Sequence, residues 1–278
     1  MKSTITHDLV ARMGIEMLPT MHPTRIGRNG ASMECSLVPW DSETFGFPVA
    51  QINLVELGEG AQARGMLQEF EAWCAVHGVR LVSCRLDHTQ LRESMALEGL
   101  GFRFVEMVHG LRLDTLEGIA APRHVIQVVK AARDDLESIE EIAYSAFTTG
   151  RFLIDWRLAP ELSKRRYATW ARTSFDVPRQ TLLKAEFDGE LVGFFIVEHR
   201  SDRRVYWHLT AIAPHWQGKG IGLSLWQTML IRHRTEGATV VETTISGHNS
   251  PAINLYSRLG FSFASAHMTF HWVREPAR

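Results

Sequence analysis

The stretch HWQGKGIG, residues 215–222, contains three glycines, a glutamine and a lysine and directly follows the apolar segment WHLTAIA (207–213). It leads into residues 220–235, whose apolar side chains recur at helical spacing. The first turn of a helix offers unpaired N–H donors and the positive end of the helix dipole, and glycines let the backbone approach an anion closely. Lys219 adds a full positive charge. These features predict a phosphate-binding loop, with an ordinary glycine-rich turn as the alternative.

The glycine spacing discriminates between phosphate ligands. No register of GKGIGLS (218–224) supplies the GxxxxGK[ST] of a P-loop, and Leu223 stands where a dinucleotide fingerprint has its third glycine. Glu242 lies near the position of an acid that would bind a ribose, but inside an apolar segment, TVVETTI (239–245), rather than at its end. Neither nucleotide-binding pattern is satisfied.

The loop instead fits the pattern Q-x-x-G-x-G, and a second stretch, NSPAINLYSRLGF (249–261), fits N-x-x-A-x-x-L-Y-x-x-x-G-F. Together the two stretches resemble the GNAT superfamily of N-acetyltransferases. The resemblance implies an α/β (α+β) GNAT fold, with a mixed central sheet flanked by helices, and acetyl-CoA held as co-substrate between two splayed strands. The residues that it assigns to acetyl-CoA are Ala211, Ile212, Ala213, Gln217, Gly218, Lys219, Gly220, Ile221, Gly222, Asn249 and, as a weaker candidate, Asn254.

The second stretch also has the local chemistry of a short helix. Ser250 is a candidate N-cap, Pro251 suits the first helical position, and Gly260 ends the helix. The resemblance implies that the Tyr256 hydroxyl points toward the thioester sulfur, which makes Tyr256 the candidate catalytic acid. The alternative is that Tyr256 is an aromatic core residue.

The two halves of the chain repeat one order of elements. LGFRF (100–104) and LGFSF (259–263) each follow a short helix and open a closing strand, which favours an internal duplication. Expected strands and helices in the first half lie at 49–55, 61–77, 79–87, 90–98 and 100–113, and in the second half at 134–147, 161–174, 181–186, 191–198, 204–213, 220–235, 238–245, 251–259 and up to 272. We therefore expect a leader at 1–33, an N-terminal degenerate GNAT-like lobe at 34–114, a linker at 115–124 and a catalytic GNAT domain at 125–278.

The first half lacks the glycine loop. Its corresponding segment, ELGEGAQARG (56–65), carries Glu56 and Glu59, and acidic side chains would repel a phosphate. The second half alone is therefore expected to bind the anionic co-substrate.

Composition and residue spacing indicate which kinds of partner and cofactor the chain is expected to have. A net charge of −1 gives no reason to expect a nucleic-acid or membrane partner. No apolar run approaches the roughly 20 residues that span a bilayer, and the three cysteines are an odd number without metal-ligand spacing. The thirteen histidines form no HExxH pattern. These observations favour a cytoplasmic protein without a metal.

The acceptor is suggested by a finer resemblance. WDSETFGFPVAQI (40–52), AFTTGRFLID (146–155) and RRYATW (165–170) resemble the two-lobed acetyltransferases of nucleotide-linked 4-amino-4,6-dideoxy sugars, typified by TDP-fucosamine acetyltransferase. In that subgroup a Ser-Arg-Phe triplet is usual, where this chain has Gly150-Arg151-Phe152. The expected acceptor is an anionic nucleotide sugar, and its candidate binding residues are Phe147, Arg151, Phe152 and Trp156. The alternative for the aromatic residues of this region, including Tyr167 and Trp170, is packing in a core.

The reaction needs a neutral amine, a polarised carbonyl and an acid for the leaving thiolate. His208 alternates with Thr210 and Ile212, so we expect it to share their face and to be a candidate base. A structural histidine is the alternative, and Glu198 and Glu242 are weaker candidates for the base. The leading hypothesis is direct transfer in a ternary complex. Acetylation of another small amine or a peptide N-terminus, and a non-catalytic acyl-CoA-binding module, remain open, as does the oligomeric state, for which a homodimer is one alternative.

Overall fold

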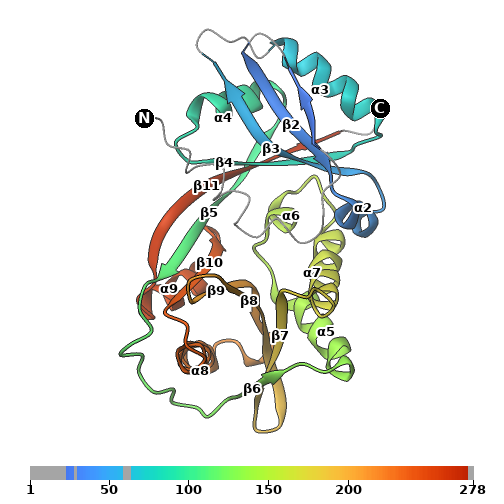
Figure 1. Cartoon of the computed structure of the whole chain (residues 1–278). Helices are drawn as coiled ribbons and strands as arrows, with labels where there is room; N and C mark the ends of the chain where they lie inside the picture. The colour runs from blue at the N-terminus through green and yellow to red at the C-terminus, as the bar shows by residue number, and fades with distance from the viewer. Residues whose placement is uncertain (1–22, 28–29, 59–63, 275–278) are drawn as a thin grey trace. The chain divides into compact units, whose positions relative to one another are not determined.

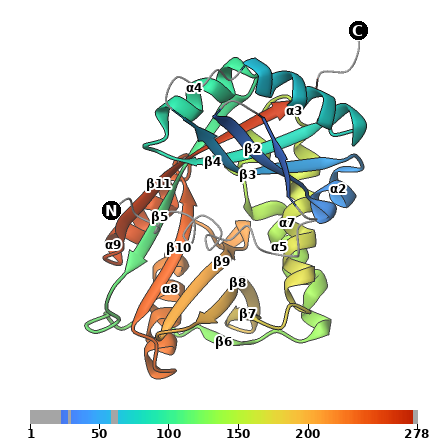
Figure 2. The same ribbon diagram turned by 45° about the horizontal axis from the view of Figure 1, so that its top comes forward.

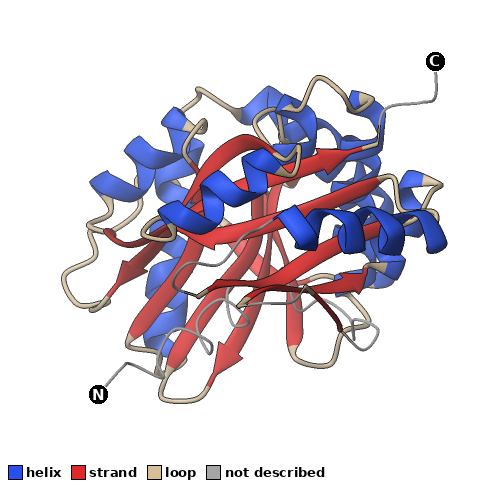
Figure 3. Cartoon of the chain, turned by 90° about the horizontal axis from the view of Figure 1, so that it is seen from above, coloured by secondary structure: helices blue, strands red, loops and turns tan. Residues whose placement is uncertain are grey.

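A computed structural model describes residues 23–27, 30–58 and 64–274 of the chain (Figure 1). The chain divides into two compact units. Unit 1 contains the residues up to Val108 together with those from Ala266 onward, and unit 2 contains His109–Ser265. In each unit helices pack against strands (Figure 3).

Unit 1 is built on a sheet with the strand order β1-β2-β3-β4-β11, in which β11 is Ser262–Val273. Its first elements in chain order are β1 (Thr24–Ile26), β2 (Ala31–Leu37), α2 (Pro39–Phe45), β3 (Val49–Leu57), α3 (Arg64–Val76), β4 (Leu81–Asp87) and α4 (Leu91–Gly99). The strands β3 and β4 pair in parallel, because α3 carries the chain back between them. Phe70 and Phe102 are fully buried in the core of this unit.

Unit 2 has the strand order β5-β10-β9-β8-β7-β6, in which β5 is Arg103–Leu113. Its elements after β5 are β6 (Gln127–Lys130), η1 (Arg133–Asp135), α5 (Leu136–Ala146), α6 (Arg151–Ile154), α7 (Pro160–Ser174), β7 (Gln180–Phe187), β8 (Glu190–Arg200), β9 (Arg204–Ile212), η2 (Pro214–Trp216), α8 (Ile221–Thr235), β10 (Val240–Ser246) and α9 (Ser250–Arg258). The strands from β6 to β9 are antiparallel, and β10 joins β9 in parallel (Figure 2).

Each half of the chain gives its closing strand to the sheet of the other half. The strand β5 (Arg103–Leu113) follows α4 but ends in unit 2, where it lies beside β10. The strand β11 (Ser262–Val273) follows α9, and its second part pairs antiparallel with β4 of unit 1, from His267↔Asp87 to Val273↔Leu81. The compact units therefore differ from the boundaries expected at residues 114 and 125.

The repeated order of elements supports the duplication inferred from the two LGF segments. The series β3-α3-β4-α4-β5 and β9-α8-β10-α9-β11 match, and each starts with a parallel strand pair. Each closing strand is preceded by a glycine with a left-handed backbone, Gly101 at φ 85° and Gly260 at φ 84°. Within the expected leader, β1 and the first residues of β2 are strands, and residues 1–22 and 28–29 lie outside the described residues.

The sheet of unit 2 is covered on two faces, and each has its own core. On one, α8 and α9 pack over Phe195, Trp207 and Val241; we call this the α8/α9 face. On the other, α5 and α7 pack over side chains that include Phe194 and Leu209; we call this the α5/α7 face. None of the described helices combines the length and apolarity that crossing a membrane requires.

Candidate active site

The parallel strands β9 and β10 separate partway along their length. Their paired residues run from Val240↔Arg204 to Thr243↔Trp207, whereas the strands continue to Ser246 and Ile212. The last pair is closed by the Thr243 hydroxyl, which donates to the Trp207 carbonyl at 2.9 Å. Beyond it, β9 pairs with β8 alone, so the edge of β9 that faces β10 carries backbone groups that β10 does not pair. We call this opening the splay.

The glycine loop joins β9 to α8 at the carboxyl end of β9. Gly218 and Gly220 have left-handed φ angles of 76° and 81°, which L side chains rarely adopt, and Gly220 is the N-cap of α8. The Gln217 side-chain amide donates to the Ile212 carbonyl at 3.1 Å and ties the loop to the strand. Residues 217–220 are exposed, and the Lys219 ammonium lies 4.7 Å from the centre of the Trp216 ring. An exposed helix N-terminus with an adjacent lysine can bind a phosphate.

The start of α9 differs from the expectation. Asn249 is the N-cap, because its side-chain oxygen accepts a hydrogen bond from the Ala252 N–H at 3.2 Å. Ser250, expected to be the cap, is already helical. The cap uses the oxygen of Asn249, so its amide NH2 remains the group with which it could bind a ligand. Asn254 is exposed on the same helix.

Tyr256 brings its hydroxyl to the splay. Its side chain is 4% exposed and lies on the α8/α9 face, with ring centres 5.0 Å from Phe261 and 6.4 Å from Trp207. Burial raises the pKa of the Tyr256 phenol, and the polar neighbours Trp226, Thr210 and Thr243 act in the opposite direction. Thr210 and Thr243 belong to β9 and β10. The phenol is therefore protonated at neutral pH beside the point where the strands separate.

His208 does not lie on the face that its sequence spacing predicted. On β8, Ile196 and Val197 are consecutive, but their partners on β9 are Leu209 and Trp207, which leaves His208 as the extra residue of a β-bulge. The bulge shifts the alternation by one, so Trp207 enters the α8/α9 core and Leu209 enters the α5/α7 core. The expectation that His208 faces the same side as Thr210 is wrong for this reason.

His208 instead lies with Glu198 and Tyr206. Its Nε2 is 2.7 Å from the Glu198 carboxylate, and its ring centre is 4.8 Å from that of Tyr206. Glu198 follows Ile196 by two residues on β8, so it continues the α5/α7 face. Tyr256 and His208 thus approach the splay from opposite faces of the sheet.

The candidate acceptor residues lie around α6. Phe152 is 2% exposed, and the guanidinium groups of Arg151 and Arg166 lie 4.6 and 5.0 Å from its ring centre, so its faces are covered. Phe147 stacks on Tyr167 with ring centres 4.3 Å apart, which agrees with the alternative that these rings pack in a core. Trp156, in contrast, is 89% exposed. Of the aromatic candidates, Trp156 is the one whose ring is open to a ligand.

Gly150 has a steric reason to be glycine. A Cβ at this position would overlap the Tyr167 hydroxyl, although its φ of −71° suits any residue. The hydroxyl of Tyr167 therefore occupies the space where the serine of the resembling subgroup would begin its side chain. A side chain at position 150 would therefore require the Tyr167 ring on α7 to move.

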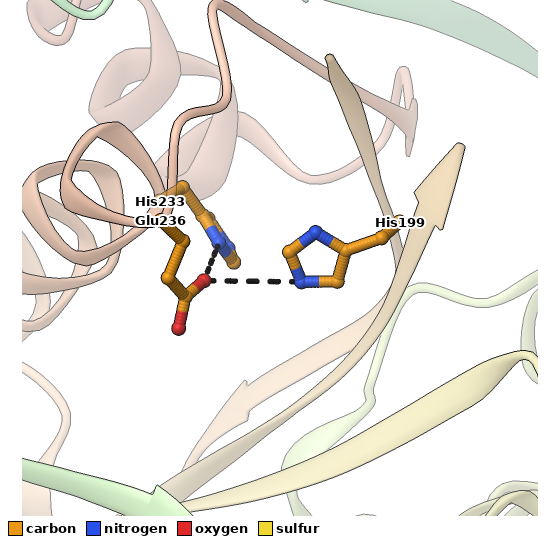
Figure 4. Close-up of side chains that lie close together, drawn as sticks. All are labelled: His199, His233 and Glu236. Atoms are coloured by element: carbon orange, nitrogen blue, oxygen red, sulfur yellow. Dashed lines mark hydrogen bonds and ion pairs between the residues drawn. The ribbon is translucent and has the colours of Figure 1, made fainter. Parts of the chain in front are cut away.

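Among the described residues, His199, His233 and Glu236 form a group that could hold a metal (Figure 4). The Trp207 indole N–H donates to His233 Nε2 at 3.0 Å, so the neutral ring carries its hydrogen on Nδ1, which is 3.2 Å from Glu236. A metal on Nδ1 would move this hydrogen to Nε2, against the indole N–H. The arrangement favours a hydrogen-bonded connection between α8 and β9 over a metal site.

This connection predicts a dependence of stability on pH. Burial lowers the pKa of His233 from 6.5 to about 4, so the unfolded chain binds a proton that the folded chain does not. The free energy of unfolding should therefore fall as the pH drops from about 6.5 to about 4, by roughly 2–3 kcal/mol. The pKa of the Glu236 carboxyl is also lowered, so the free energy of unfolding falls further when this carboxylate is protonated at acidic pH.

Urea unfolding from pH 7.5 to 4.5 measures the effect. His233→Gln keeps an acceptor for the Trp207 indole and should show a flatter dependence than the parent. Parallel curves for the parent and the variant would contradict the assignment.

Comparison with known proteins agrees with this geometry. Residues 136–261 match the model of the Acetyltransferase (GNAT) family. The chain is 27% identical over 145 residues to the spore coat polysaccharide biosynthesis protein SpsD of Bacillus subtilis, covering 52% of this chain and 50% of that protein. It is 34% identical over 110 residues to the L-2,4-diaminobutyric acid acetyltransferase of Nocardia farcinica, covering 37% of this chain and 55% of that protein. The chain thus matches about half the length of each of these relatives.

A solved structure extends the similarity of fold to both units. A tandem GNAT protein from the clavulanic acid biosynthesis pathway aligns with a TM-score of 0.61 and 15% sequence identity, covering 97% of this chain and 89% of that protein. This likeness confirms the expected GNAT fold and its two-lobed arrangement. The segment that carries the glycine loop, the splay and Tyr256 lies within the part of the chain that matches the acetyltransferase (GNAT) family.

Proposed function

We propose that the chain is a cytoplasmic N-acetyltransferase that moves an acetyl group from acetyl-CoA to the amine of a nucleotide-linked 4-amino-4,6-dideoxy sugar. The observation that carries the proposal is the splay, which has the glycine loop at its end, the Tyr256 hydroxyl on one face and His208 on the other. In this proposal the second half, 125–278, is the catalytic domain and the first lobe is degenerate.

The unpaired edge of β9 suits the amide-bearing arm of acetyl-CoA. Backbone groups of Ala211–Ala213 would bind that arm as a further strand would be bound. The N–H groups of residues 217–222 and the Lys219 ammonium would bind the pyrophosphate. The amide NH2 of Asn249 would add a contact at the start of α9, whereas the exposed Asn254 has no such support.

The two faces of the splay divide the proton transfers of a direct reaction. The acceptor nitrogen attacks the thioester carbon, the C–S bond breaks, and the departing sulfur takes the proton of the Tyr256 hydroxyl. The attacking nitrogen loses its proton to His208 on the other face. A backbone N–H of β9 at the splay would stabilise the carbonyl oxygen as negative charge develops. Acid and base on opposite faces fit a ternary complex in which both substrates are bound at once.

The acceptor assignment rests on Arg151 and on the relatives. The Arg151 guanidinium, held against Phe152, would offer a cation to a nucleotide diphosphate, and the exposed Trp156 ring would offer an aromatic surface to the ligand. The similarity to a polysaccharide biosynthesis protein supports a sugar acceptor. Phe147 and Phe152 would then support this surface from beneath rather than stack on the ligand.

Arg151→Ala is expected to raise the acceptor KM about tenfold or more and to leave acetyl-CoA affinity unchanged. A hydrogen bond to a charged group contributes about 1.5–3 kcal/mol, which corresponds to a tenfold or larger change. Arg165→Ala, an exposed arginine on α7, is the matched control for the loss of one positive charge. Equal acceptor KM values for the parent and Arg151→Ala would contradict the role.

The experiment that tests the function is a screen of acceptors for acetyl-CoA-dependent release of CoA. The panel contains TDP- and UDP-linked 4-amino-4,6-dideoxy sugars, L-2,4-diaminobutyrate, a polyamine and a peptide with a free N-terminus. The proposal predicts release with a nucleotide sugar at least tenfold faster than with the other amines.

A second candidate is acetylation of a small amino acid amine, favoured by the similarity to L-2,4-diaminobutyric acid acetyltransferase. Faster release with diaminobutyrate than with any nucleotide sugar would select it and reject the sugar acceptor.

A further inference from the structure

We propose that Glu198 is a positioning residue that fixes the tautomer of His208, so that Nδ1 is the atom that accepts the acceptor amine's proton. The inference rests on the proposed function for its chemical consequence. Its structural content, the tautomer of one buried histidine, can be tested without any acceptor.

The contact between the two side chains is short and buried. His208 Nε2 lies 2.7 Å from Glu198 Oε2, and the side chains are 3% and 13% exposed. The hydrogen bond from His208 lowers the pKa of the Glu198 carboxyl, with Arg200 and Arg179 adding to the effect while burial opposes it. Arg200 Nε also lies 3.6 Å from Glu198 Oε1. Glu198 is therefore ionised at neutral pH.

An ionised carboxylate accepts hydrogen bonds and cannot donate one. The ring nitrogen that faces it, Nε2, must then carry the hydrogen, and in a neutral imidazole the other nitrogen holds a free lone pair. That other nitrogen, Nδ1, is buried and has no hydrogen-bond partner among the described residues. His208 Nδ1 is one of several buried polar atoms without such a partner, and it is the one that lies on β9 at the splay.

The bulge explains why the imidazole is held in this place. A β-bulge redirects the side chain of its extra residue. His208 is that residue, and it lies where β9 separates from β10. Its neighbour Trp207 is fixed from the opposite face by the hydrogen bond to His233 on α8. The bulge is thus held on one face by His233 and on the other by Glu198.

Glu198 itself is poorly suited to accept the proton. Its lowered pKa makes it a weak base, and both of its oxygens already face cationic or N–H groups of Arg200 and His208. Its effect is exerted through His208. When Nδ1 takes the proton, the ring becomes an imidazolium, and the adjacent carboxylate stabilises its positive charge without being protonated.

Nitrogen-15 NMR of the full chain labelled at histidine tests the tautomer directly. The His208 signals are identified by their loss in His208→Gln. We expect a protonated Nε2 and an unprotonated Nδ1 in the parent at pH 7.5, and a mixture of tautomers in Glu198→Gln, because an amide can either accept or donate. A protonated Nδ1 in the parent, or an unchanged single tautomer in Glu198→Gln, would overturn the inference.

Kinetics tests the consequence. Glu198→Gln is expected to lower kcat about tenfold or more, within the range of a general-base contribution, and to leave acetyl-CoA affinity unchanged. In the pH dependence of kcat, the decrease on the acidic side should occur at lower pH than in the parent. The control is Glu242→Gln, because Glu242 also lies near Arg200, at 3.9 Å, but binds Arg112 rather than a histidine. In Glu242→Gln, the decrease of kcat on the acidic side should occur at the same pH as in the parent.

The outcomes separate the two proposals. Acetyl transfer with identical pH profiles in the parent and Glu198→Gln would reject the role of Glu198 and leave the proposed function standing. Failure of every acceptor would reject the proposed function, while the NMR result would still decide the tautomer.

Discussion

Tyr256→Phe is expected to lower kcat by about 10²–10⁴-fold at saturating substrates, the usual range for general acid catalysis, with the lower end expected because a CoA thiolate is a fairly stable leaving group. The change removes one hydroxyl beside Thr210 and Thr243 and keeps the ring that packs on Phe261 and Trp207. Folding and acetyl-CoA affinity should therefore be preserved. The measurement is kcat, together with a thermal melt and acetyl-CoA binding.

Tyr206→Phe is the matched control, because Tyr206 is 3% exposed and its hydroxyl faces Thr244 instead. The competing hypothesis is that the Tyr256 ring fills the core and its hydroxyl takes no part. A kcat for Tyr256→Phe within about threefold of the parent, with stability and binding preserved, would support that hypothesis and reject the acid.

Gly220→Asp is expected to weaken acetyl-CoA binding about 100-fold or more. Gly220 has a φ of 81° and caps α8, so an aspartate would strain the loop and place a negative charge among the N–H groups proposed for the pyrophosphate. Loss of one or two charge-assisted hydrogen bonds, at about 1.5–3 kcal/mol each, gives an effect of this size. Gly189→Asp, with the same φ of 81° in the turn between β7 and β8, controls for the backbone strain.

Calorimetry on the parent should show one site per chain. The first half keeps a parallel pair, β3 with β4, whose pairing also ends early, at Ile52↔Cys84. Two acidic residues lie in the segment 56–65 that corresponds to the glycine loop. Glu56 is paired with Arg25 at 2.7 Å, and Glu59 lies outside the described residues. The absence of a second site therefore stays a prediction. Two equivalent sites, or affinity retained in Gly220→Asp, would contradict binding through the second half alone.

Local patterns predicted the features that depend on local chemistry. The glycine-rich turn between a strand and a helix was predicted at residues 215–222, and there Gly218 and Gly220 adopt left-handed angles that L side chains rarely adopt. Gly260 ends α9 for the same kind of reason. Tyr256 was placed by its position in a motif, and the helix that presents it has the expected length within a residue or two.

Features that depend on pairing between distant segments were not visible in the sequence. The bulge at His208 is a property of the register between β8 and β9, so the period-two alternation gave the wrong face. The exchange of β5 and β11 between units leaves no compositional mark, so the expected boundaries followed the linker composition. The partner of His208, Glu198, was considered only as a base, because its position opposite the bulge requires the sheet to be known.

The most direct measurement is a single-turnover incubation with acetyl-CoA labelled in the acetyl group, with and without a TDP-linked 4-amino-4,6-dideoxy sugar, followed by separation of protein, CoA and sugar. We predict that the label passes to the sugar amine with release of CoA when both substrates are present, and that no label is found on the protein. Labelled protein formed without acceptor would contradict direct transfer of the acetyl group from acetyl-CoA to the amine. Bound acetyl-CoA that transfers its label neither to this sugar nor to any other amine of the acceptor panel would contradict the proposed enzyme and favour an acyl-CoA-binding module.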